Sequence, residues 1–448
     1  LFFSEILEAR KLFQEAAVGK ISTEALKRRL NGFSTLPPFE IESFEKSKQS
    51  EAPDEDSIDH LLGMVALPEQ ATRSHTHAGR SDITASYIRQ ALEHVYADPE
   101  FRSVEATWRG LRLVLQQFTD TSDIVLELVP TSSNTLEETV KGLEHHLQVE
   151  PPALVIVDLP LDNSPLSMGL LEGIAGFAER MLAPTVCWVT HRFLYLDSWE
   201  ELGNLPYLPH HITGQTYAKW RRITQSPGAN WVTITCNPVL ARSPYGPGNM
   251  PRILPFEEAQ LLWASPVWPL GGLVAQSMAK KKWPTRFTSW KEIRVEDLPI
   301  ADCGIRRSCC ALAEISEERF HQFIAAGITP VLVPKNKDYA FVPDETTING
   351  GSLSFQSLLS RTVQVFMALE RDVDMPSNPE DLAEVVKQRF CLFWENTGHP
   401  RPGDLSVSAV RDEKADHIAL SISFTPPPGI LSSPQKIQFQ LLWGNRSS

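Results

Sequence analysis

Short apolar runs alternate with helical patterns along most of this chain, and this alternation limits the possible fold more than any other feature. The runs are rich in Val and Ile and are only five to seven residues long, as buried strands are. Strands of this kind are predicted at 123–129, 153–158, 184–189 and 231–235. Helices are predicted at 83–97, 101–118, 166–181 and, for the most part, 257–282. Such an order of elements is typical of an α/β fold.

The C-terminal part of the sequence has a different pattern. At 418–424 and 437–443, apolar and polar residues alternate on either side of a Pro-Pro-Pro-Gly loop. A period of two is typical of antiparallel strands with one exposed face. The expected fold class is therefore α/β (α+β), with mixed sheets flanked by helices and antiparallel strands at the C-terminal end.

The first 33 residues predict two short helices. Apolar residues recur at helical spacing up to about Val18. Ser22 is placed to cap a second helix, with Ile21 and Leu26 at the positions of a hydrophobic staple and Gly32 at its end. A helix pair this short is marginal alone, so it must pack on another part of the protein.

A polar segment follows the helix pair. Residues 34–56 are rich in Pro, Ser, Glu and Lys and contain too few apolar residues to order themselves. Residues 57–69 predict a short amphipathic helix, and a second polar stretch follows it. Amphipathic islands of this kind often bind the groove of a partner. The apolar positions of the island are Ile58, Leu61, Leu62 and Leu67.

Composition excludes several classes of protein. The 448-residue chain has a net charge of −13, whereas nucleic-acid-binding domains usually carry a basic face. Its apolar runs are far shorter than the roughly 20 residues of a membrane helix, and its N-terminus lacks the pattern of a signal peptide. The six cysteines are scattered and fit no zinc spacing, which predicts reduced thiols. A cytoplasmic protein without membrane insertion is expected.

No enzyme motif is present in the sequence. It contains no phosphate-binding G-x-x-x-x-G-K-[ST], no G-x-G-x-x-G after a strand, no G-x-S-x-G and no H-E-x-x-H. The histidine pairs lack further ligands at metal-binding spacing, and surface histidine is the simpler interpretation. They are His75 with His77, His145 with His146, and His210 with His211. We therefore assign no catalytic, cofactor-binding or metal residues and predict that the protein is not an enzyme.

Two tryptophans are better explained by packing than by binding. Trp108 lies at helical spacing from Val104, Leu111 and Leu115, so it is predicted to belong to a buried stripe. Gly110 beside it would let another segment approach the helix closely. The same buried role is predicted for Trp220.

Three arginines flank apolar anchors and leave two interpretations open. Arginines in such places often form bidentate pairs with carboxylates across an interface, but they can also be merely solvated. The residues in question are Arg221, Arg222 and Arg242. Farther along, Ser316 is placed to cap a helix over 317–326.

Five segments of the sequence resemble one family, the large subunit of the contractile sheath of bacterial type VI secretion. They occur in the same order as in that family. The similarity covers roughly residues 57 to 443, although WKEIR stands where that family usually has glycines before VEDLP. The segments are HVYADPEFRSVEATWRGLRLVLQQF at 94–118, YAKWRRI at 217–223, ARSPYG at 241–246 with LPFEEAQLLWASPVWPLGGLVAQSMAKKKWP at 254–284, VEDLP at 295–299, and ISEERFHQFIAAGITPVLVPKNKDYAFV at 315–342.

The resemblance implies a mechanical function. Sheath subunits assemble into a helical cylinder around an inner tube and contract to propel it, and neighbouring copies add strands to each other's sheets. The implied partners are the small sheath subunit, neighbouring copies, the inner tube protein, the baseplate and a Clp-family ATPase that dismantles contracted sheath. Two alternatives remain open: a sheath or baseplate relative of another contractile injection machine, and an α/β enzyme with an unrecognised site.

The N-terminal helix pair is similar to the end of the small sheath subunit, which implies a natural fusion of the two subunits. The expected domains are then residues 1–33 as small-subunit helices, 34–80 as a tether, 81–300 as sheath core, and 301–448 as inner-wall and C-terminal region. We expect the pair to dock on the sheath fold, preferably that of an adjacent copy.

The resemblance also implies roles for individual residues. The island at 57–69 would be recognised by the ATPase through Ile58, Leu61, Leu62 and Leu67. The helix after Ser316 would face the tube with its first turn, although Ala325 and Ala326 replace the acids usual in the family. The tube-facing residues would be Glu317, Glu318 and Arg319.

Overall fold

The structure, a computed structural model, describes most of the chain. The described residues are 2–17, 20–34, 78–118, 124–147, 151–246, 249, 256–303, 306–373, 378–411, 417–433 and 435–444. They form two compact units, one of Leu1–Glu105 with Ser243–Leu261 and one of Ala106–Arg242 with Leu262–Ser448. This division differs from the expected domain ranges, because residues 243–261 return to the first unit.

The first unit is a small helical assembly. It contains α1 (Phe2–Ala17), α2 (Thr23–Leu30), α5 (Ala78–Ala97) and the start of α6 (Pro99–Leu115). Ser22 caps α2 as predicted, because its Oγ accepts a 3.2 Å hydrogen bond from the Ala25 N–H. The helix pair packs on α5 of its own chain. The shared core consists of Ala9, Leu12, Phe13, Leu26, Leu30, Ile88, Ala91, Leu92 and Phe256.

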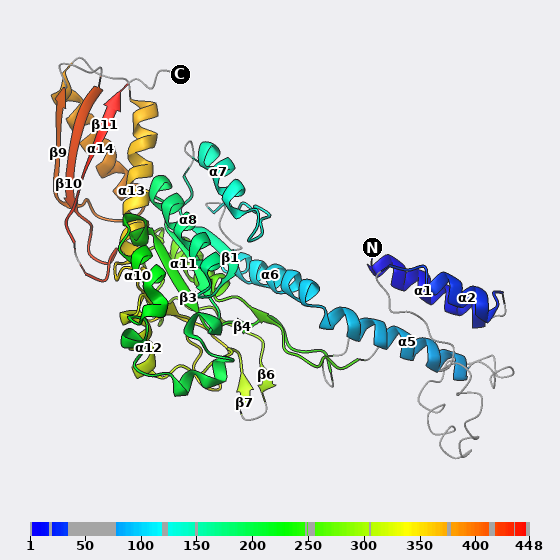
Figure 1. The fold of residues 1–448 in the computed structure, drawn as a ribbon. Helices are drawn as coiled ribbons and strands as arrows, with labels where there is room; N and C mark the ends of the chain where they lie inside the picture. Colours follow the sequence, from blue (N-terminus) through cyan, green and yellow to red (C-terminus); the bar gives the residue numbers. More distant parts are fainter. Residues whose placement is uncertain are drawn as a thin grey trace. The chain divides into compact units, whose positions relative to one another are not determined.

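The second unit is built on a parallel four-stranded sheet (Figure 1). Its strands lie side by side in chain order, and all neighbouring pairs are parallel. They are β1 (Val155–Leu161), β2 (Thr185–Val189), β3 (Val232–Cys236) and β8 (Ile328–Pro330). The strands predicted at 153–158, 184–189 and 231–235 are thereby confirmed.

The strand predicted at 123–129 is not formed. Residues 124–131 are described as irregular backbone, and among the described strands none pairs with them. Leu126 packs against the core, but the Val125 side chain is 83% exposed. Strong β-propensity makes a strand only where a neighbouring strand supplies hydrogen bonds, and none of the described strands does so for this segment.

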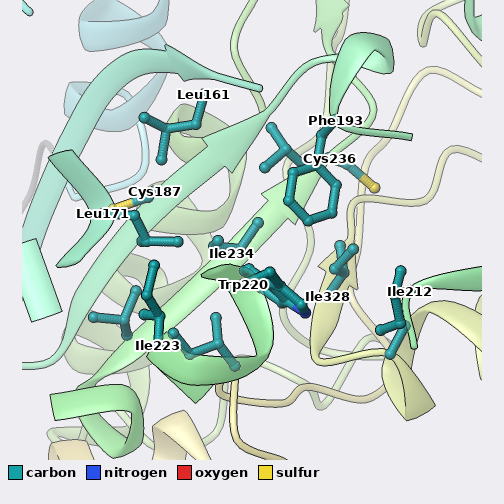
Figure 2. Packing of buried hydrophobic residues seen from close by; sticks show 14 of the residues in the cluster. Leu161, Leu171, Cys187, Phe193, Ile212, Trp220, Ile223, Ile234, Cys236 and Ile328 are labelled. Atoms are coloured by element: carbon teal, nitrogen blue, oxygen red, sulfur yellow. The ribbon is translucent and has the colours of Figure 1, made fainter. Parts of the chain in front are cut away.

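Both faces of the sheet are covered. One face packs against α8 (Pro165–Met181) and α10 (Ala218–Thr224), and Figure 2 shows this core. Its labelled members include Leu171, Cys187, Trp220, Ile223, Ile234 and Ile328. The opposite face, which includes Val186, packs against α11 (Val267–Lys281) and α6. α7 (Leu136–Leu147) lies beside α8.

The remaining elements of this unit are short. The helix predicted over 257–282 begins only at Val267, after Pro266, because Trp263–Ala264 forms β5 opposite β4 (Val239–Leu240). β6 (Ala301–Cys303) and β7 (Arg306–Cys309) form a hairpin. The described residues of this unit also form α9 (Leu208–His211) and α12 (Glu317–Ala325). Their 3-10 helices lie at His191–Leu194, Trp199–Asn204, Gln215–Tyr217 and Pro227–Trp231.

The C-terminal part is an antiparallel sheet covered by two helices (Figure 1). The strand order is β11 (Ile437–Gly444), β10 (His417–Thr425), β9 (Gly403–Arg411), so the two predicted strands are confirmed and β9 is added. α13 (Leu353–Asp372) and α14 (Pro379–Asn396) were not predicted. They pack on the apolar face of the sheet, which includes Ile418, Leu420, Ile422 and Phe424.

Candidate assembly surfaces

The helix predicted to face the tube has the expected start. Ser316 Oγ accepts a 3.2 Å hydrogen bond from the Arg319 N–H, which confirms the cap, and α12 ends one residue before the predicted end. Phe320 and Phe323 are buried and anchor the helix on the core. Its first turn is therefore fixed in position, with the Glu317 and Glu318 side chains exposed.

Arg319 binds the protein's own backbone. Its Nη2 donates to the carbonyl of Leu205 at 2.9 Å, and its Nη1 donates to the carbonyl of Pro206 at 3.0 Å. Its Nη1 also donates to Gln322 Oε1 at 2.8 Å, and that oxygen accepts from the Leu208 N–H at 3.2 Å. Arg319 and Gln322 thus hold the segment before α9 against α12, a role that the sequence did not indicate.

The charge left exposed at this end of α12 is negative. Glu314, Glu317 and Glu318 are all exposed, and we call these three residues the acidic surface. Glu318 accepts a 3.3 Å hydrogen bond from Gln322, and acidic side chains are favourable at the N-terminus of a helix. The arrangement suits a partner with basic side chains.

The three candidate interface arginines lie in different environments. Arg221 is exposed on α10, next to the buried Trp220. Arg222 Nη2 pairs with both carboxylate oxygens of Glu172 on α8, at 2.9 and 3.0 Å. Arg242 is only 7% exposed, so most of its side chain is covered within the chain. The structure therefore does not bring the three side chains together on one surface.

The predicted ATPase-recognition residues cannot be placed. Ile58, Leu61, Leu62 and Leu67 lie outside the described residues. Their role stays a prediction from the sequence.

One packing prediction is wrong and another is confirmed. Trp220 is buried as expected, but Trp108 is 60% exposed. α6 instead buries the face that carries Gly110, Leu111 and Val114. Gly110 does allow a close approach, since a Cβ there would lie 2.1 Å from Cδ1 of Trp268.

A carboxylate that sequence reasoning missed connects the elements around that contact. Asp158, on β1, accepts hydrogen bonds from Thr107 Oγ1 at 3.0 Å, Ser265 Oγ at 2.5 Å and Trp268 Nε1 at 2.8 Å. The signal in the sequence was an aspartate inside an otherwise apolar run, ALVIVDLPL. A polar residue at such a position usually has buried partners.

The described strands of the parallel sheet lack the arrangement that commonly binds ligands in α/β enzymes. Ligands bind where the strand order reverses, whereas the order β1, β2, β3, β8 follows the chain without reversal. Within the part of the chain that the structure describes, no three His, Cys, Asp or Glu side chains gather as a metal site would require. Burial raises the pKa of the Cys187 thiol to about 12, which makes it a poor nucleophile. None of the described helices is long and apolar enough to cross a membrane.

Comparison with known proteins identifies relatives among sheath proteins. The type VI secretion system sheath protein TssC1 of Pseudomonas aeruginosa is 25% identical over 273 residues, which is 54% of this chain and 55% of that protein. The chain thus spans about half the length of this relative. Among solved structures, the sheath tail protein of Listeria innocua has a TM-score of 0.38 at 9% identity, covering 70% of this chain and 61% of that one. The sheath tail protein of Desulfitobacterium hafniense has a TM-score of 0.36 at 9% identity, covering 72% and 62%.

A family model supplies the broader match. VipB (EvpB/VC_A0108), tail sheath N-terminal domain, matches residues 82–349. That range includes the whole parallel sheet, the helices on both of its faces, and α12. Because the match extends over more than half of the 448 residues, the chain belongs to the VipB family of tail sheath proteins.

Proposed function

We propose that this protein is a structural subunit of the contractile sheath of a bacterial type VI secretion system and is not an enzyme. In this role copies assemble into a cylinder around an inner tube in the cytoplasm and contract to propel the tube. The observation that carries the proposal is the VipB family match over residues 82–349, which includes the complete parallel sheet. The strand order without a reversal agrees with a fold that serves assembly.

The N-terminal helix pair supports a fusion with the small sheath subunit. α1 and α2 share a buried core with α5 and Phe256, although residues 35–77, which connect the pair to α5, lie outside the described residues. If α1 and α2 derive from the small subunit, they need a complementary surface on this chain, and the core shared with α5 provides one. Neighbouring sheath copies and the baseplate complete the proposed structural partners.

The acidic surface is the proposed contact with the inner tube. Glu314, Glu317 and Glu318 are exposed on a helix start that Ser316 and two buried phenylalanines hold in place. Carboxylates fixed in this way steer and orient a basic partner more than they add affinity. Arg319, the third residue proposed to face the tube, also holds the neighbouring segment through its hydrogen bonds to Pro206 and Leu205.

The three arginines remain proposed interface residues, but they differ in how readily each could contact a neighbouring copy. Arg221 is exposed and is free to meet a carboxylate of a neighbouring copy. Arg222 already has Glu172 as a partner, and Arg242 is largely buried, so both would first have to rearrange.

Electron microscopy of the purified protein with its small-subunit part tests the proposed function. We expect hollow tubules whose inner diameter accommodates a tube, and no hydrolase activity in the same preparation. Monomers that persist under all assembly conditions would contradict the proposal.

A further inference from the structure

Arg361 lies over aromatic rings in the C-terminal part of the second unit. Its Cζ is 5.0 Å from the centre of the Trp283 ring and 5.8 Å from that of Phe393. Its Nη1 donates to Met278 Sδ at 3.3 Å, and a thioether is only a weak acceptor. The guanidinium is thus held in place mainly by ring faces.

No carboxylate of the described chain neutralises this arginine. Among the described residues Arg361 forms no ion pair, and its Nε is buried without a hydrogen-bond acceptor. Acids on nearby elements are already engaged, since Glu395 pairs with Arg401 at 2.7 Å and Glu292 with Lys281 at 2.5 Å. A buried charge without a counter-ion is unfavourable.

The surroundings of Arg361 are rich in donors and poor in acceptors. Trp283 stacks on Trp394 with ring centres 4.5 Å apart, and the indole N–H of each is buried without an acceptor. Ser357, one turn before Arg361 on α13, also has a buried hydroxyl without a partner. Buried polar groups are nearly always satisfied in functional assemblies, so this cluster lacks an acceptor.

The same surroundings suit an incoming carboxylate. Arg361 is half-buried, and the Trp283 and Phe393 rings lie against its guanidinium and exclude water from that side. Burial lowers the pKa of Arg361 from its usual value, but an arginine remains charged at neutral pH. A planar fork in such a site binds a carboxylate through two parallel hydrogen bonds.

We propose that Arg361 is a receptor for an Asp or Glu side chain of a second copy of this chain in the assembled sheath. This inference rests on the proposed sheath function. The chain supplies suitable ligands, because its 55 acidic residues exceed its 42 basic ones and leave carboxylates unpaired within one copy. Assembly would place one of them at the site and satisfy the guanidinium there.

Substitutions of two arginines, Arg361 and Arg401, test the proposal. R361Q should reduce the amount of sedimentable polymer at a fixed protein concentration about tenfold or more. R401Q is the matched control, since Arg401 is exposed and already pairs with Glu395 within the chain, and it should leave assembly unchanged. Polymer formation by R361Q equal to that of the wild type would overturn the proposal. If the wild type itself forms no polymer, the proposed function fails instead.

Cross-linking keeps the test decisive should R361Q fold poorly. The amine introduced by R361K can be joined to a carboxylate by a carbodiimide in polymers mixed from nitrogen-14 and nitrogen-15 copies. Mass spectrometry should find the cross-link between light and heavy peptides. Cross-links confined to one isotope would show an intrachain partner and contradict the proposal. In the wild type, modification of Arg361 by phenylglyoxal should fall about tenfold on assembly, and equal modification in monomer and polymer would also contradict it.

Discussion

The indole N–H of Trp268 donates a 2.8 Å hydrogen bond to Asp158 Oδ2, across 110 residues of sequence. The same carboxylate accepts from Ser265 and Thr107, so one side chain on β1 joins the start of α11 to α6. Hydrogen bonds to a charged acceptor are stronger than neutral ones. Asp158 therefore stabilises the packing of these helices on the sheet.

The first prediction is that D158N destabilises the protein by about 2 kcal/mol, because the amide keeps the size of the side chain but loses the charge and one acceptor oxygen. Urea denaturation followed by circular dichroism measures the change. D404N, at an exposed position on β9, is the control and should have little effect. Equal midpoints for the two variants would show that the Asp158 hydrogen bonds contribute nothing to stability.

The second prediction concerns two glycines, both on helices. G110A should destabilise the fold by about 1–3 kcal/mol, because the new methyl group must displace the Trp268 ring. G142A on α7 meets nothing within 4 Å and should stabilise the protein by up to about 1 kcal/mol. Thermal unfolding of both variants checks the opposite signs. A stabilising G110A would mean that Trp268 moves away without cost.

The sequence predicted the elements whose signals are local. Apolar runs identified β1, β2 and β3, and side-chain caps identified the starts of α2 and α12 at Ser22 and Ser316. Alternation identified β10 and β11. In each case the residues that carry the signal also make the stabilising contact.

The predictions that failed concern residues whose contacts are with segments far away in the sequence. A helical stripe at Trp108 could not reveal that α6 turns Gly110 and Leu111 toward Trp268 instead. Strand propensity at 123–129 could not reveal that none of the described strands pairs with residues 124–129. The roles of Asp158 and Arg319 likewise depend on groups that are more than 50 residues away.

The third prediction separates two functions within α12. R319A removes hydrogen bonds to the carbonyls of Leu205 and Pro206 and should lower stability by about 1–3 kcal/mol. E317Q combined with E318Q should change stability by less than about 1 kcal/mol yet weaken co-sedimentation of the sheath with purified tube. Unchanged tube binding by the double variant would exclude these two acids from the contact.

The fourth prediction concerns the N-terminal helix pair. A protease site inserted at Ser50 would cut the connection outside the described residues, and the fragment with α1 and α2 should stay bound to the isolated chain because of the core shared with α5. L26D should release the fragment, whereas R28E, exposed on the same helix, should not. Gel filtration shows which species co-elute. Release of the wild-type fragment from single chains would mean that docking requires a second copy.

The fifth prediction addresses disassembly. Replacing Leu61 and Leu62 by Asp should leave tubules intact but abolish binding of the ATPase's N-terminal domain, because burial of a leucine side chain contributes about 1.5–3 kcal/mol. Fluorescence anisotropy with a peptide of residues 57–69 measures the binding directly. L67D alone removes one apolar side chain and is a milder variant, for which an intermediate affinity is expected. An unchanged affinity of the double variant would refute the assigned role.

The order of strands in the parallel sheet also has a consequence for biosynthesis. β2 adds beside β1 and β3 beside β2, so each strand that leaves the ribosome finds its neighbour already made. β8 is synthesised much later than β3, because the long segment with α11 and the β6–β7 hairpin lies between them. Until β8 arrives, β3 has an open edge that another nascent chain can reach. The interval between β3 and β8 is therefore the stage of synthesis at which a chaperone would protect this chain most.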